Sequence, residues 1–157
     1  MIEIKDITKS FEDRTVLHGV SATFETGKTN LIIGQSGSGK TVLMKSLVGL
    51  VRPEKGEILF DGRDLLKMSG DETKNLRKEI GMLFQGSALF DSETVLGNVM
   101  FPLVMFTGMS RDEMLERAHF CISRVNLTGA ENKFPSEISG GMQKRVAIAR
   151  AIALNPT

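Results

Sequence analysis

The chain has 157 residues, 41% of them hydrophobic and 25% charged, which is ordinary for one globular domain with a buried core. Its net charge of +1 gives no general reason to expect a nucleic acid or an anionic membrane surface as a partner. The single cysteine, Cys121, excludes an intrachain disulfide and indicates a reducing compartment such as the cytoplasm. The apolar runs are far shorter than a membrane span, and the first residues lack a signal-peptide pattern, so we expect no direct membrane insertion.

Five short segments of apolar character predict strands in the first part of the chain. The expected strands are 2–7, 15–24, 29–33, 57–60 and 80–84. Turn residues bound two of them, with Glu12-Asp13 after the first and Asp61-Gly62 after the fourth. The third and fifth segments have the character of strands buried in a parallel sheet.

Helical periodicity predicts the remaining elements. We expect helices at 40–50, near 71–78, within 95–127 and at 141–154. Ser110 and Glu113 have the spacing of a capping box, which would open a helix inside the third of these segments. Strands come first and a helical insertion follows, so the sequence predicts an α/β fold with a β-rich N-terminal part and an α-helical subdomain.

The run Gly34-Gln35-Ser36-Gly37-Ser38-Gly39-Lys40-Thr41 matches the phosphate-loop pattern G-x-x-x-x-G-K-[ST] at every fixed position. Glycines let the backbone wrap closely around phosphate oxygens, and the helix that follows adds its positive N-terminal end. Lys40 would reach the β- and γ-phosphates, and the Thr41 hydroxyl would ligate Mg²⁺. We therefore expect ATP and Mg²⁺ to bind here; the alternative is a flexible glycine loop without a ligand. A phosphate loop alone does not choose between kinases, GTPases, motors and transporters.

A second glycine motif, Ile138-Ser139-Gly140-Gly141-Met142-Gln143, stands at the start of the last expected helix. A serine and two glycines there make either a second anion site or a plain N-cap. In this motif the chain resembles the ABC ATPases, whose signature is an LSGGQ-type sequence in the same setting. Ile138 replaces the usual Leu and Met142 the usual Gln, with Gln143 one place later. In that family the signature faces the ATP of the opposite subunit. The resemblance thus implies a head-to-tail homodimer and a role in it for Ser139, Gly140, Gly141, Met142 and Gln143.

Three further residues match ABC-family positions. Gln85 follows the expected strand 80–84 and takes the place of the Q-loop glutamine, which completes the Mg²⁺ site and links it to the helical subdomain. Phe11 takes the place of the aromatic residue that stacks on adenine, and Val16 follows it as a second ATP contact. The alternative for Phe11 is a core or strand-end residue.

The resemblance covers the whole chain and implies a P-loop NTPase core in a partial ABC-type ATP-binding domain. Its parts would be a nucleotide-binding core at 1–90, a helical subdomain at about 91–138 and the signature helix at 139–157. The family's Walker B strand with its Glu, and its switch His, would follow Thr157. Lys40 and Gln85 would therefore contribute to an incomplete catalytic set. We expect this chain to bind nucleotide and to hydrolyse it hardly at all, although the full-length protein would be an ATP hydrolase.

The stretches 84–92 and 98–103 look like those of bacterial Mla-type ATPases, which energise phospholipid movement in the cell envelope. This implies a transmembrane permease as a partner and a cytoplasmic location, peripheral on the inner face of the cell membrane. The alternatives are an ATPase for amino-acid import or lipoprotein export, an ABC-type ATPase without a membrane partner, and a regulatory module that binds nucleotide without turnover. The apolar segment 99–106 either docks the permease or packs inside the helical subdomain.

Overall fold

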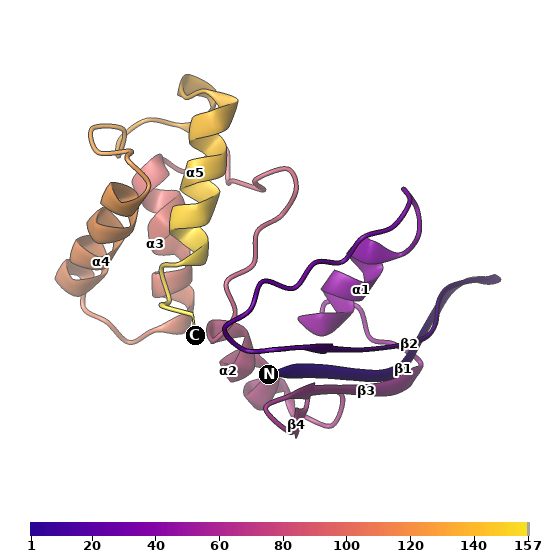
Figure 1. The fold of residues 1–157 in the computed structure, drawn as a ribbon. Coiled ribbons are helices and arrows are strands. Elements are labelled where there is room, and N and C mark those ends of the chain that lie inside the picture. Colours follow the sequence, from indigo (N-terminus) through magenta and orange to yellow (C-terminus); the bar gives the residue numbers. More distant parts are fainter. Residues whose placement is uncertain (157) are drawn as a thin grey trace. The chain divides into compact units, whose positions relative to one another are not determined.

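A computed structural model describes residues 1–156 as two compact units, which divide between Asn75 and Leu76 (Figure 1). The sequence places the end of the nucleotide-binding core near residue 90, whereas the structure groups residues 76–90 with the helices that follow them. Within residues 1–156, no helix has both the length and the apolar character needed to cross a lipid bilayer.

The first unit contains an antiparallel sheet with the strand order β2-β1-β3-β4 (Figure 1). Its strands are β1 (Ile2–Phe11), β2 (Arg14–Phe24), β3 (Lys55–Phe60) and β4 (Arg63–Asp64). Ile4 of β1 pairs with Ala22 of β2 on one side and with Ile58 of β3 on the other. Ile4, Ile7 and Ile58 are buried and form the apolar side of this sheet. Three of the four strands expected in this unit, at 2–7, 15–24 and 57–60, are confirmed, whereas the short β4 was not expected.

Two expected strands, 29–33 and 80–84, are not strands in the structure. The sheet of the described residues consists of antiparallel pairs between β1, β2, β3 and β4, and these two segments take no part in it. Leu31 and Ile33 each expose 81% of their surface, so the first segment is not buried either. A strand buried on both faces forms only when neighbouring strands satisfy its backbone. An apolar run specifies burial but cannot supply those neighbours.

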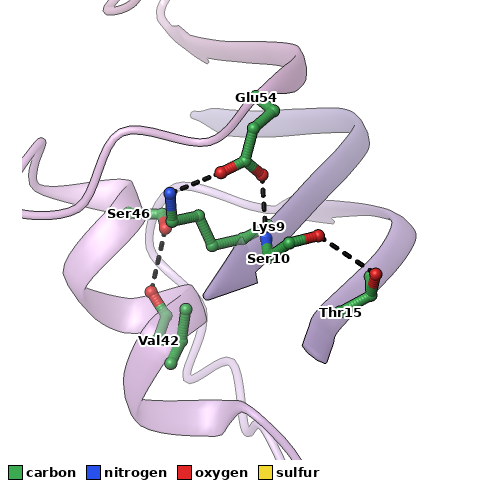
Figure 2. Close-up of polar contacts among 6 residues, drawn as sticks. All are labelled: Lys9, Ser10, Thr15, Val42, Ser46 and Glu54. Atoms are coloured by element: carbon green, nitrogen blue, oxygen red, sulfur yellow. Dashed lines mark hydrogen bonds and ion pairs between the residues drawn. The ribbon is translucent and has the colours of Figure 1, made fainter. Parts of the chain in front are cut away.

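Helix α1 (Lys40–Leu47) follows the glycine-rich loop and is shorter than the expected 40–50. The helix ends where the backbone N–H groups of Gly49 and Leu50 turn back to the carbonyls of Ser46 and Lys45, at 3.0 and 2.8 Å. Ser46 is fully buried, and its hydroxyl donates to the carbonyl of Val42 in the same helix at 2.9 Å (Figure 2). The buried hydroxyl is thereby satisfied inside α1. Helix α2 (Gly70–Lys78) is the expected short helix.

The second unit is built on three helices, α3 (Val95–Phe106), α4 (Arg111–Arg124) and α5 (Gly140–Ala151). A single turn of 3₁₀ helix, η1 (Pro135–Glu137), precedes α5. The three helices share one core, to which they contribute Val95, Val99, Leu103, Ala118, Cys121, Ile122, Val146 and Ala149. The sequence predicts a signature helix at 139–157 apart from the helical subdomain. In the structure this helix, α5, packs in the same core as α3 and α4.

The predicted capping box opens α4. The Ser110 hydroxyl accepts from the Glu113 N–H at 3.3 Å, and the Ser110 N–H donates to the Glu113 carboxylate at 2.7 Å. We expect Ser110→Ala to lower the free energy of unfolding by about 1 kcal/mol, because the Glu113 N–H loses its acceptor and the Glu113 carboxylate loses the hydrogen bond from the hydroxyl. Urea unfolding of the helical unit measures this loss. Ser123→Ala, at an exposed serine on the same helix, should cost clearly less.

The stability that this capping box contributes is expected to depend on pH. The Ser110 hydroxyl, and then its backbone N–H, hold the pKa of Glu113 below its ordinary value. A lowered folded pKa means that the carboxylate stabilises the helix at neutral pH and that this contribution is lost as the pH falls through the folded pKa. The difference in stability between the native chain and Ser110→Ala should therefore shrink on acidification below about pH 4. A difference that stays constant with pH would contradict this role of Glu113.

Candidate nucleotide-binding site

The glycine-rich loop 34–39 leads directly into α1. Gly37 and Gly39 have φ angles of +79° and +91°, in the left-handed region that glycine adopts without steric cost. The Ser38 N–H donates to the Gln35 carbonyl at 3.2 Å and closes the turn. Gly39 is the N-cap residue of α1 and brings no side chain to the first N–H groups of the helix. The start of α1 therefore has no side-chain cap, which is an arrangement that suits an anion.

The loop packs against β2 at one point. A Cβ atom on Gly39 would lie 3.0 Å from Leu17 Cδ2 and 3.1 Å from Val16 Cγ1 and from the Val16 carbonyl oxygen. The structure therefore brings Val16 next to the phosphate loop, where the sequence expected an ATP contact. The close approach also explains in physical terms why the sixth position of the motif is glycine.

The Lys40 ammonium lies over the loop. Its Nζ donates to the carbonyls of Gly34 and Gln35, both at 2.7 Å. An ammonium group has three donors, so one remains for a further acceptor. Thr41, the next residue, is exposed on the first turn of α1. Lys40, Thr41 and the turn of 34–39 thus form one small polar site that fits phosphate oxygens and a hydrated Mg²⁺.

Phe11 is the last residue of β1 and lies opposite Arg14 at the tip of the β1–β2 hairpin. It is 46% exposed, so of the two alternatives the core residue does not fit and the strand-end residue does. The role of Phe11 in stacking on adenine stays a prediction. The Lys9 ammonium lies 5.1 Å from the centroid of its ring. An exposed aromatic ring on the hairpin that supports the phosphate loop is available to a planar base.

The second glycine motif caps α5. The Ser139 hydroxyl accepts from the Met142 N–H at 3.3 Å, and the Gln143 N–H donates to the Ser139 carbonyl at 2.9 Å. Ser139, Gly140 and Gly141 are exposed, whereas Met142 is half-buried against the helical core. The Gln143 side-chain amide donates to the Pro135 carbonyl at 2.9 Å and thus joins α5 to the 3₁₀ turn before it. In the structure, the Gln143 side chain therefore stabilises the motif and does not extend outward from it.

Gln85 lies in an exposed turn of the second unit, and two residues that the sequence did not single out hold the segment after it. Arg150 of α5 donates to the carbonyls of Ser87 and Ala88, both at 2.8 Å. Asn98 of α3 is fully buried and bonds to the N–H and the carbonyl of Phe90 at 2.9 and 3.1 Å. The Arg150 contacts join residues 62 and 63 positions apart, which no local pattern predicts. The Asn98 contacts span only eight positions, but the resemblance of the stretch 98–103 gave them no role.

The expected site residues are thus divided between the two units. Phe11, Val16 and the phosphate loop belong to the first unit, where Val16 contacts the loop. Gln85 and the motif at 139–143 belong to the second unit, where Arg150 links the helix of that motif to the Gln85 segment. Among residues 1–156, no group of three or more His, Cys, Asp or Glu side chains is placed to hold a metal ion. A Mg²⁺ ion here would take its ligands from hydroxyl, amide and phosphate oxygens.

The second unit also has an apolar groove of about 320 Å³. Its lining includes Phe84, Phe90, Phe101, Pro102, Phe106 and Arg150. The rings of Phe90 and Phe101 are in contact, with centroids 4.5 Å apart. Val99 and Leu103 are buried in the core, as expected for packing inside the helical subdomain, whereas Val104 and Met105 are exposed. Docking of a permease at the segment 99–106 stays a prediction.

Comparison with known proteins decides the family. The ABC transporter family profile matches residues 17–157. The chain belongs to the ABC transporter family. This ABC chain has the P-loop NTPase fold class expected from its sequence, because it aligns over 99% of its length with the ATP-binding cassette MJ0796. That match, to a dimeric post-hydrolysis structure bound to ADP and Pi, has a TM-score of 0.89 at 34% identity and covers 71% of that chain.

Its relatives within the ABC family serve different transport systems. The chain is 43% identical over 155 residues to the probable ribonucleotide transport ATP-binding protein mkl of Mycobacterium leprae. It is 42% identical over 156 residues to the intermembrane phospholipid transport system ATP-binding protein MlaF of Haemophilus influenzae, and 40% identical over 156 residues to the methionine import ATP-binding protein MetN of Rhizobium johnstonii. Each match includes 99% of this chain, which spans 45%, 59% and 43% of the three relatives. The matches show an ABC ATP-binding protein and leave several cargoes open.

Proposed function

We propose that this chain binds MgATP as the phosphate-holding part of an ABC transporter ATPase. The observation that carries the proposal is the Lys40 ammonium, held 2.7 Å from two carbonyls of the loop 34–39 at the uncapped start of α1. Phosphate oxygens bound to the loop would meet this ammonium and the N-terminal end of the helix together. Thr41 supplies an oxygen ligand for Mg²⁺, and Phe11 and Val16 contact the nucleoside, all from the first unit. Gln85, in the second unit, is the further Mg²⁺ ligand that the resemblance to the ABC ATPases implies. Full-length members of the family hydrolyse ATP.

The exposed Ser139, Gly140 and Gly141 at the start of α5 support a second role in the same function. Their backbone N–H groups would bind the γ-phosphate of ATP held by a second subunit, with Met142 and Gln143 supporting them from within. The dimeric ADP- and Pi-bound form of the similar cassette MJ0796 supports this arrangement. Two such chains, head to tail, would then enclose two ATP molecules.

The apolar groove of the second unit supports a membrane permease as the further partner. Phe101, Phe106 and the exposed Met105 offer apolar surface of the kind that receives a helix of another protein. This partner would place the chain on the cytoplasmic face of the cell membrane. For the cargo we favour phospholipid in the cell envelope, supported by the likeness to MlaF; the likeness to MetN supports amino-acid import as the second candidate.

Titration with ATP and Mg²⁺ tests the phosphate site directly. We expect Lys40→Ala to weaken ATP affinity about tenfold to a hundredfold, since hydrogen bonds to charged groups contribute roughly 1.5–3 kcal/mol. Isothermal titration calorimetry of the chain measures the affinity. Lys45→Ala, near the other end of α1, is the matched control and should leave it within twofold. Equal ATP affinities of the native chain and Lys40→Ala would show that the phosphate loop is not the ATP site.

A further inference from the structure

Glu54 contacts three consecutive residues near the end of β1, two through its carboxylate and one through its backbone N–H. The two oxygens of Glu54 accept from the Lys9 ammonium at 2.5 Å and from the Ser10 N–H at 2.8 Å (Figure 2). The Glu54 N–H donates to the Thr8 carbonyl at 3.0 Å. Glu54 lies in the connection between α1 and β3, so this contact ties the chain after α1 to the strand that ends in Phe11.

The Lys9 ammonium takes part in a second contact, with the ring of Phe11. It lies 5.1 Å from the ring centroid, within the range of a cation–π interaction. The Lys9 side chain is only 16% exposed, because it lies between Glu54 and the ring. One side of the ring is thus covered by an ammonium group, while 46% of Phe11 remains open.

The same hairpin carries Val16, the other residue proposed to contact the nucleoside. The hydroxyls of Ser10 and Thr15 are 3.0 Å apart and join the strands beside Phe11 (Figure 2). Val16, the next residue of β2, contacts the phosphate loop at Gly39. The orientation of the Phe11 ring is therefore set within the same unit, and by the same strands, as the loop that holds the phosphates.

We propose that Lys9 and Glu54 position the Phe11 ring so that its uncovered face stacks on the nucleotide base. The inference rests on the proposed function, in which Phe11 contacts the base of ATP. Glu54 fixes the ammonium, the ammonium holds one face of the ring, and a base can stack only on the other face. Lys9 and Glu54 are positioning residues: they act on the base through Phe11.

Comparing ATP with inorganic tripolyphosphate, both with Mg²⁺, separates base from phosphate contacts. We expect Lys9→Met and Glu54→Gln to weaken ATP binding about two- to fivefold, a part of what base stacking on an aromatic residue contributes. Tripolyphosphate binding should not change. In a Phe11→Ala background, Lys9→Met should have no further effect on ATP. Lys67→Met is the matched control, because Lys67 pairs with Asp64 and Glu57 elsewhere in the unit.

A second readout does not depend on nucleotide. The chain contains no Trp and no Tyr, so Phe11→Trp introduces a single indole fluorophore at the tip of the hairpin. We expect acrylamide to quench the emission of this introduced tryptophan more strongly when Lys9→Met or Glu54→Gln is added, because the covered face of the ring opens. Unchanged quenching in both would overturn the inference.

The outcomes keep the inference and the proposed function apart. If Phe11→Ala leaves the ratio of ATP to tripolyphosphate affinity unchanged, the base does not stack on Phe11, and both the inference and that part of the proposed function fail. If Phe11→Ala lowers the ratio and Lys9→Met does not, only the positioning by Lys9 fails. If Lys9→Met weakens both ligands equally, Lys9 acts as a general positive charge, which also overturns the inference.

Discussion

Replacing Gly39 by alanine is expected to disable the phosphate loop, with a much larger effect than the same change at Gly37. Both glycines have left-handed φ angles, so alanine costs roughly 1–2 kcal/mol of strain at either position. A Cβ on Gly39 would also meet Leu17 and Val16 at 3.0 and 3.1 Å, whereas a Cβ on Gly37 has no atom within 4 Å. Overpacking of this kind adds about 1–3 kcal/mol. Gly39→Ala should therefore cost roughly 2–5 kcal/mol in total.

Two measurements compare Gly39→Ala with Gly37→Ala. Urea unfolding of both variants, with hydrogen exchange of α1 as the local probe, gives the difference in stability within the first unit. Calorimetric titration with ATP gives the functional loss, which should exceed tenfold for Gly39→Ala because the loop can no longer rest on β2. Similar losses for Gly37→Ala and Gly39→Ala would show that backbone strain alone governs the loop and that its packing on Val16 is immaterial.

Replacing Arg150 by methionine is expected to release the segment that follows Gln85. Arg150 donates to the carbonyls of Ser87 and Ala88, whose φ angles of +61° and +47° are unusual for residues other than glycine. Its guanidinium lies 5.8 Å from the ring centroid of Phe90, and burial lowers its pKa below the ordinary value. Two hydrogen bonds from a charged donor hold this strained turn. We expect their loss to destabilise the second unit by roughly 2–4 kcal/mol.

Hydrogen exchange resolved along the chain measures the release. Peptides covering 85–91 should exchange at least tenfold faster in Arg150→Met, since the turn loses its bonds to α5. Arg145→Met is the matched control on the same helix: Arg145 donates to the carbonyls of Val125 and Asn126, so its loss should loosen the end of α4 instead. Faster exchange at 85–91 in both variants would mean that α5 as a whole, rather than Arg150, holds the Gln85 segment.

Much of the local structure follows from short patterns in the chain. The capping box at Ser110 and Glu113, the serine cap of α5 and the start of α1 after Gly39 form where the sequence predicts them. Each of these features depends on residues within four positions of one another, so its energetics are local. The P-loop NTPase fold class is predicted by the resemblance to the ABC ATPases that the Gly34–Thr41 and 138–143 motifs indicate, although the strand expected at 29–33 before the first motif does not form.

Contacts between distant segments could not be predicted in this way. The apolar pattern of 29–33 indicates a buried strand, yet Leu31 and Ile33 are exposed, because strand formation depends on neighbours that the pattern does not specify. The sequence likewise gives no sign that Arg150 bonds to Ser87 and Ala88. These outcomes depend on which surfaces meet after folding, and no local rule encodes them.

The phosphate loop shows both what the sequence motif indicates and what only the tertiary structure adds. Its glycines, lysine and threonine occur within eight consecutive residues, and their chemistry alone indicates a phosphate ligand. Only the tertiary structure shows that Gly39 rests on Val16 and that Lys9, held by Glu54, covers one face of Phe11. The motif determines which ligand can bind because its donors are local. The packing would determine how a base is held, because it joins the β1–β2 hairpin to Glu54, which lies 45 residues after Lys9 in the segment that follows α1.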